Sequence, residues 1–176
     1  GYIGQFDDFF PNLEGYIKKK IVLKVSDYRS AIIQGKFLAK KGLWVSEYRI
    51  ESGLNCGGHA FATDGLLMGP ILSEFSDNRQ SLVDQTYEVL EKGLSDLSRI
   101  VPRAKLNIKV TAQGGVGTAK EQSFLIDHYN LDSVGWGTPF LLVPEVTTVD
   151  NDTREKLLKA QERDLYLSDV SPLGVP

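Results

Sequence analysis

Glycine residues follow one of the predicted strands at a point where backbone amides could bind a phosphate. Residues 106–112 have strand composition, and a glycine turn follows: Gln113, Gly114, Gly115, Val116 and Gly117. Thr118 and Glu121 form a T-x-x-E capping box, which predicts a helix from Thr118 to Tyr129. Glycines let a ligand approach the backbone closely, and the amides and dipole at a helix N-terminus favour an anion. We expect a phosphate at residues 116–120; the alternative is a turn that holds no ligand. The turn matches neither the P-loop nor the G-x-G-x-x-G pattern.

A second glycine turn follows the next predicted strand. Residues 133–137 form the next predicted strand, and its end has the sequence Gly135, Trp136, Gly137, Thr138. In a barrel of alternating strands and helices, the loops after the seventh and eighth strands together form a phosphate site. Two successive glycine-bearing turns therefore favour a phosphate over a purely structural role.

A histidine stands at the end of another predicted strand. Residues 43–51 lead into a glycine-rich loop that contains Cys56, Gly57, Gly58 and His59. His59 could accept a proton near neutral pH; the alternative is a histidine with an ordinary place at the surface or in the core. Cys56 has the character of a small packed residue, with a reactive thiol beside His59 as the alternative.

Lys24 and His128 carry weaker signals. Lys24 lies near the end of the first predicted strand, where a solvated lysine is the simplest interpretation and a ligand contact is the alternative. His128 lies inside a predicted helix between Asp127 and Tyr129, and we expect an ordinary surface residue.

Strands and helices alternate along the chain. This alternation, with helices of crossover length, predicts an α/β fold with a parallel sheet covered by helices. The expected strands are 17–25, 43–51, 106–111 and 133–137, the first of them buried; the expected helices are 28–41, 77–97, 118–129 and 152–163. Residues 60–76 have no clean period and contain Gly69-Pro70, so a long ordered loop is expected there.

Apolar spacing predicts which side of each helix faces the core. The residues concerned are Ile33, Phe37 and Leu38 in the first helix, Val83, Tyr87, Leu90, Leu94 and Leu97 in the second, and Leu157 and Leu158 in the last. Gly42 is the expected stop of the first helix.

Composition excludes several classes of protein. The chain has 176 residues, a formal net charge of −3, one cysteine and two histidines. A negative charge does not attract nucleic acid or an acidic membrane, and a lone cysteine forms no internal disulfide. A Cys/His zinc site, a signal peptide and a membrane span are not expected either. We expect a cytoplasmic protein that acts on a small-molecule substrate.

The motifs together resemble those of a known family. CGGH, then QGGVGTA, then GWGTPFL and DLYLSDVSPLGVP are similar to the second half of the nitronate monooxygenase (2-nitropropane dioxygenase-like) family. The resemblance runs from about Lys18 to the C-terminus. It implies an FMN-binding (β/α)₈ TIM barrel and an oxidoreductase. Flavin-dependent enoyl-acyl-carrier-protein reductases share the motifs.

The resemblance also implies roles for individual residues. The FMN phosphate would be held by Gly114, Gly115, the Val116 amide, Gly137 and Thr138. His59 would take the place of the family histidine that stands by the flavin and acts as base, with Gly57 and Gly58 as cofactor contacts. Lys24 resembles the strand lysine that touches the flavin ring in other FMN barrels. Asn55 and Cys56 before the glycines, and Ala60-Phe61 after His59, depart from the family pattern and leave the substrate open.

Length limits how much of a barrel is present. A full (β/α)₈ barrel takes about 250 residues, whereas this chain has 176 residues and does not begin with Met. We expect a single domain or fragment, residues 1–176, that contains about strands five to eight. The rest of the barrel would come from an N-terminal part or from another chain. The alternatives are a phosphate-binding barrel lyase or isomerase without flavin, and a non-catalytic module.

Overall fold

The computed structural model describes residues 2–51, 68–114, 116, 118–136 and 148–164. Within these residues, strands and helices alternate as the sequence predicts. The elements are η1 (Tyr2–Gln5), η2 (Asp7–Phe9), β1 (Ile21–Val25), α1 (Tyr28–Ala39), β2 (Val45–Glu51), α2 (Met68–Asp96), β3 (Lys109–Gln113), α3 (Ala119–Tyr129), β4 (Ser133–Gly135), α4 (Asn151–Lys159) and η5 (Glu162–Asp164).

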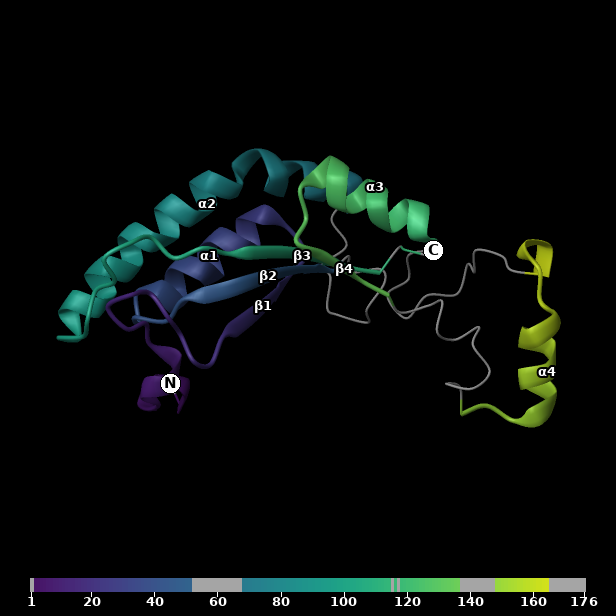
Figure 1. Cartoon of the computed structure of the whole chain (residues 1–176), viewed down its shortest axis with the longest axis horizontal. Coiled ribbons are helices and arrows are strands. Elements are labelled where there is room, and N and C mark those ends of the chain that lie inside the picture. Colours follow the sequence, from purple (N-terminus) through teal and green to yellow (C-terminus); the bar gives the residue numbers. More distant parts are fainter. Residues whose placement is uncertain (1, 52–67, 115, 117, 137–147, 165–176) are drawn as a thin grey trace.

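The four strands form one parallel sheet in the order β1-β2-β3-β4. Each strand is hydrogen-bonded to the next one along the chain, and the order never reverses. Helices α1, α2 and α3, which join successive strands, therefore all lie on the same face of the sheet (Figure 1). The predicted α/β class with a parallel sheet is confirmed, with helices on one face.

The core lies between the sheet and this helix layer. Alternate strand residues point towards the helices and are buried, as the period of two in a strand requires. Val25 of β1, Tyr48 and Ile50 of β2, and Val110 and Ala112 of β3 form this inner face. The largest helical contribution comes from α2, through Ile71, Leu72, Phe75, Leu82, Val83, Tyr87, Leu90 and Leu94.

The opposite face of the sheet is polar. We define the open face as the side chains that alternate with the core residues: Val22, Lys24, Glu47, Arg49, Glu51, Lys109, Thr111, Gln113 and Ser133, together with Gly135. None of helices α1 to α3 covers it (Figure 1). Because Val22 is 46% exposed and only Val25 of β1 is buried, the expectation of a buried first strand is wrong.

Helix α1 begins and ends where the sequence indicates, but it buries a different side. The Asp27 side chain accepts a hydrogen bond of 2.6 Å from the Ser30 amide and caps the helix. Gly42 follows the helix with φ of +72°, a left-handed conformation that favours glycine. The buried residues are the small ones, Ala31, Gly35 and Ala39.

The predicted core positions Ile33 and Phe37 are instead 57% and 58% exposed. Helix α1 approaches the sheet and α2 too closely for large side chains: a Cβ on Gly35 would meet the Tyr48 hydroxyl. Leu38 packs against the core in a partly buried position. The apolar spacing alone therefore indicated the wrong side of this helix.

Helix α2 is longer than predicted. Its first turn contains Gly69 and Pro70, the residues that predicted a loop. The helix begins at Met68, so the expected loop is wrong over residues 68–76; residues 60–67 lie outside the described residues. Proline fits the first turn of a helix, where its missing N–H would have no partner in the helix. The predicted core positions in α2 are confirmed, except that Leu97 lies beyond the helix end and is 50% exposed.

The remaining differences concern where elements begin and end. Strand β1 begins at Ile21 instead of residue 17, and β3 begins at Lys109 instead of residue 106, although Ile17 and Leu106 are buried. Helix α4 buries no residue, and Leu158 is 61% exposed, so the predicted core face of that helix is wrong. None of the helices within the described ranges has the length and apolarity that crossing a bilayer requires.

Candidate functional site

The carboxyl ends of the strands form the edge of the sheet at which parallel α/β proteins bind their ligands. We call this edge the rim and define it by Lys24, Glu51, Gln113, Gly114 and Gly135. Two predicted site residues, Lys24 and Gly114, belong to it, and Val116 is two residues beyond Gly114 in the chain. The structure therefore places Lys24 and Gly114 at the same edge of the sheet.

Most of the other predicted site residues lie outside the described residues. They are Cys56, Gly57, Gly58, His59, Gly115, Gly137 and Thr138. Their roles stay predictions from the sequence.

The glycine turn after β3 is joined to the end of β4. The Gly114 amide donates a hydrogen bond of 3.2 Å to the Gly135 carbonyl oxygen. Gly114 has φ of +89°, a conformation that side chains rarely adopt, and Val116 is buried with 4% of its surface exposed. The first glycine of the turn is thus hydrogen-bonded to the last residue of β4.

The predicted capping box at the start of α3 is confirmed. Thr118 Oγ1 accepts a hydrogen bond of 3.3 Å from the Glu121 amide, and Glu121 Oε2 accepts one of 2.9 Å from the Thr118 amide. The first four amides of a helix have no partner within the helix, so the box satisfies two of them. The amides of Ala119 and Lys120 have no hydrogen-bond acceptor among the described residues.

The Gly114 backbone and the amides at the start of α3 are chemically suited to bind the phosphate of a cofactor such as FMN. Backbone amides at a helix N-terminus donate to phosphate oxygens, and a bare glycine leaves room for them. The exposed Lys120 adds a positive charge in the first turn of α3. The Glu121 carboxylate opposes an anion, because it already places a negative charge at this helix end.

Lys24 and Glu51 form an ion pair at the rim. The Lys24 Nζ lies 2.9 Å from Glu51 Oε2, and the Glu51 side chain is only 11% exposed whereas that of Lys24 is 50% exposed. The half-exposed lysine is held by a carboxylate on the neighbouring strand. The interpretation of Lys24 as a simply solvated strand-end lysine is therefore incomplete.

A second polar network lies on the open face, farther from the rim along β2 and β3. Glu47 Oε1 accepts a hydrogen bond of 2.9 Å from the Thr111 hydroxyl and lies 3.5 Å from Arg49 Nη2. Thr111 is 5% exposed, so its hydroxyl needs this partner. A sheet face built from such pairs is suited to a polar ligand or to another polar protein surface.

The sequence interpretation did not single out Gln113 or Glu51. Both follow from the strand period of two once the register is known, because Glu51 pairs with Gln113 and Gln113 pairs with Gly135 across neighbouring strands. Just beyond β4, the Trp136 indole N–H donates to Gln122 Oε1 at 2.5 Å and ties this segment to α3.

His128 lies on the surface of α3, as predicted. It is exposed and stacks on Phe124 with ring centroids 4.9 Å apart. A histidine in this position is not part of the rim.

The tyrosines with shifted pKa values pack in or against the core between the sheet and the helices. Burial raises the pKa of Tyr48 far above its ordinary value, against the opposing effect of a hydrogen bond with Thr86. Burial also raises the pKa of Tyr28, whose hydroxyl donates to the Asn78 carbonyl oxygen at 3.2 Å. Both phenols stay protonated at neutral pH, so neither is suited to act as a base.

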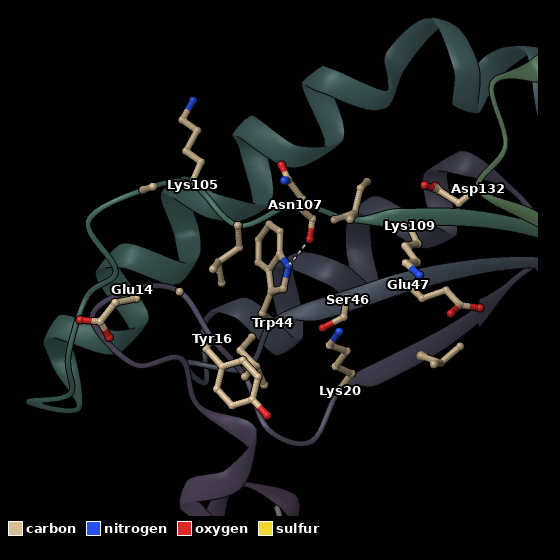
Figure 2. A pocket seen from close by; sticks show the side chains of 16 residues that line it. Glu14, Tyr16, Lys20, Trp44, Ser46, Glu47, Lys105, Asn107, Lys109 and Asp132 are labelled. Carbon is tan, nitrogen blue, oxygen red and sulfur yellow. Dashed lines mark hydrogen bonds between the residues drawn. The ribbon is translucent and has the colours of Figure 1, made fainter.

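A cavity of about 600 Å³ lies at the opposite end of the strands (Figure 2). Tyr16, Lys20, Trp44, Ser46 and Lys109 are among its lining residues. The Trp44 indole N–H in its wall already donates to the Asn107 carbonyl oxygen at 3.0 Å. Because this cavity is at the amino ends of the strands, it is separate from the rim.

Comparisons with known proteins leave the family open. No protein-family model matches the chain, and no curated protein is found to be similar to it. Within the described part of the chain, no three His, Cys, Asp or Glu side chains gather as a metal site would need.

Proposed function

We propose that this chain is the C-terminal half of an FMN-dependent (β/α)₈ barrel oxidoreductase that resembles nitronate monooxygenases. The observation that carries the proposal is the hydrogen bond between Gly114 and Gly135. It joins Gly114, the first glycine after β3, to Gly135 at the end of β4, which supports a phosphate site shared by the two turns that follow these strands.

The order of the strands supports a barrel. In doubly wound folds the order reverses at one point, so that helices cover both faces of the sheet. Here the strands follow one another without reversal and the helices share one face (Figure 1). Under this proposal the open face is the barrel interior. The other strands come from an N-terminal part or from another chain, because β1 and β4 are the edges of the described sheet.

Gly114 of the rim and the residues that follow it have distinct roles in the proposal. The backbone of Gly114 and Val116 and the amides of Ala119 and Lys120 hold the phosphate. Gly115, Gly137 and Thr138 complete the site, on the resemblance alone. FMN, when bound, supplies the redox chemistry.

The chain itself supplies proton transfer and charge. His59 accepts a proton from a carbon acid substrate, with Gly57 and Gly58 beside it, and its role likewise comes from the resemblance. Lys24, held by Glu51 at 2.9 Å, places a positive charge at the rim near the flavin ring. We also propose that the protein acts in the cytoplasm, which its single cysteine supports.

A phosphate site without flavin is the second candidate function. Glycine turns and free helix amides bind any phosphate monoester, so a barrel lyase or isomerase that acts on a phosphorylated substrate would use the same groups. His59 would again be the base. Binding of a phosphorylated compound without binding of FMN would favour this alternative. A flavin-dependent enoyl-acyl-carrier-protein reductase would share the FMN site and differ in substrate.

Titration with FMN of the whole protein, meaning this chain together with the rest of the proposed barrel, tests the proposal. We expect quenching of flavin fluorescence that saturates, and a loss of affinity of at least about tenfold in Gly114→Ala, because a Cβ there forces the turn out of its conformation. Gly42→Ala is the matched control: Gly42 also has positive φ but lies at the end of α1, near the amino ends of the strands. Wild-type protein that shows no saturable binding would contradict the proposal.

A further inference from the structure

Gln113 lies at the centre of the rim, directly before Gly114 and opposite Gly135. It is the last residue of β3 and pairs with Glu51 of β2 on one side and with Gly135 of β4 on the other. Its side chain belongs to the open face, and the next residue is Gly114. The carboxamide therefore extends from the same strand end as the proposed phosphate-binding turn.

Gly135 makes room for this carboxamide. A Cβ built on Gly135 would collide with Oε1, Cδ and Nε2 of Gln113. The amide group thus lies directly against the bare backbone of β4. Its orientation is fixed by contact, and it points across the sheet towards the strand from which the second glycine turn follows.

The Gln113 carboxamide contains a hydrogen-bond donor, its NH₂ group, and an acceptor, its oxygen. It is partly buried, and the described residues provide no hydrogen-bond partner for its oxygen or nitrogen. Other polar groups of the open face do have partners, as in Lys24 with Glu51 and Thr111 with Glu47. A carboxamide fixed in place without a partner is suited to bind a ligand, because leaving it unpaired costs stability.

We propose that Gln113 binds the hydroxyl groups next to the phosphate of the bound ligand, which in FMN is the ribityl chain. This inference rests on the proposed phosphate site. The side chain starts one residue before Gly114, so the atoms within its reach are those closest to the phosphate. A carboxamide matches a polyol because each hydroxyl both donates and accepts a hydrogen bond.

Three ligands of increasing size separate this role from the phosphate site itself. Calorimetric titration of the same whole protein with inorganic phosphate, ribitol 5-phosphate and FMN would measure the three affinities. We expect Gln113→Ala to lower the affinity for ribitol 5-phosphate and for FMN by roughly three- to tenfold, which is the contribution of one or two neutral hydrogen bonds. The affinity for inorganic phosphate should stay unchanged. Gln34→Ala is the matched control, since Gln34 is an exposed glutamine of α1 that bonds Ser30.

The outcomes distinguish the two proposals. If Gln113→Ala lowers the affinity for all three ligands equally, or for none of them, the proposed role of Gln113 is overturned while the phosphate site stands. Wild-type protein that binds none of them would overturn both.

A paired substitution separates binding from folding. Gly135→Ala alone should lower stability, because the new methyl group displaces the Gln113 amide. Gly135→Ala combined with Gln113→Ala should restore much of that stability, because the methyl then fills the space the amide leaves. The double variant should still bind ribitol 5-phosphate as weakly as Gln113→Ala does. Recovery of full affinity in the double variant would show that Gln113 acts only through the shape of the fold.

Discussion

Gly114 donates its amide proton to the carbonyl oxygen of Gly135, across 3.2 Å, and this bond ties the turn after β3 to the end of β4. Gly114 needs its left-handed φ of +89°, and Gly135 needs its missing side chain to admit Gln113. Each glycine therefore has a separate steric reason to be glycine. Together they produce a stretch of bare backbone at the carboxyl edge of the sheet, where a phosphorylated ligand could bind.

The capping box at the start of α3 should contribute to stability. Thr118→Ala removes the side-chain acceptor of the Glu121 amide, so we expect the free energy of unfolding to fall by about 1 kcal/mol. Chemical denaturation with urea measures the change. Thr148→Ala is a suitable comparison, because Thr148 is an exposed threonine that lies outside the helices and strands. A loss no larger than in that control would contradict the role of Thr118.

The charge of Glu121 should oppose anion binding at the same helix end. Glu121→Gln keeps an oxygen that can accept from the Thr118 amide but removes the negative charge. We expect affinity for FMN or phosphate to rise about two- to fivefold, the usual value of one charge near a helix N-terminus. Titration at low and high salt would check the cause, because screening should reduce the gain. Unchanged affinity at low salt would place the anion elsewhere.

The ion pair between Lys24 and Glu51 should be worth little to stability. Because the Lys24 side chain is half exposed, solvent screens the attraction, and a double-mutant cycle with Lys24→Met and Glu51→Gln should give a coupling of about 0.5 kcal/mol. The pair should matter more for ligand binding, since Lys24→Met removes a positive charge from the rim. Equal affinity for FMN in wild type and Lys24→Met would argue against a contact with the flavin.

Gly35 should tolerate a methyl group only when Tyr48 loses its hydroxyl. A Cβ on Gly35 would meet that hydroxyl and lie 3.1 Å from a methyl carbon of Thr86, so Gly35→Ala should cost about 1 to 3 kcal/mol. Tyr48→Phe removes the obstructing atom. We expect the double variant to lose less stability than the sum of the single variants, as measured by thermal or urea unfolding. Simple additivity would contradict the predicted contact.

These cases show which features a sequence can predict. The strand-helix alternation and the T-x-x-E box predict the parallel sheet and the start of α3, because both depend on residues close in the chain. The buried side of α1 could not be predicted in this way. Ile33 and Phe37 have the stronger apolar character, but the helix packs through Ala31, Gly35 and Ala39 because Tyr48 and α2 come so near.

The same distinction applies to the site. The glycine turn was visible in the sequence because its residues are consecutive. Gln113 was not, because its importance depends on the register that sets it against Gly135, more than twenty residues later in the chain. The start of α2 was missed for a local reason: Pro70 indicates a loop unless it falls in the first turn of a helix.

Tyr48 should make the fold sensitive to alkaline pH. Burial raises the pKa of its phenol above the ordinary value near 10, so the folded protein keeps a proton that the unfolded chain loses. The unfolded state then binds fewer protons above pH 10, and the free energy of unfolding should fall as pH rises through this range. A single such group contributes a slope of about 1.4 kcal/mol per pH unit.

Tyr48→Phe isolates this contribution, because phenylalanine fills the same space in the core without an ionisable group. The variant should lose some stability at neutral pH, where the hydrogen bond with Thr86 is missing. Between pH 9 and pH 11 its stability should decline less steeply than that of the wild type, by roughly the slope of one group. Urea unfolding across this range measures both. Parallel pH profiles would mean that Tyr48 ionises in the folded state as readily as in the unfolded chain, which its burial among core residues argues against.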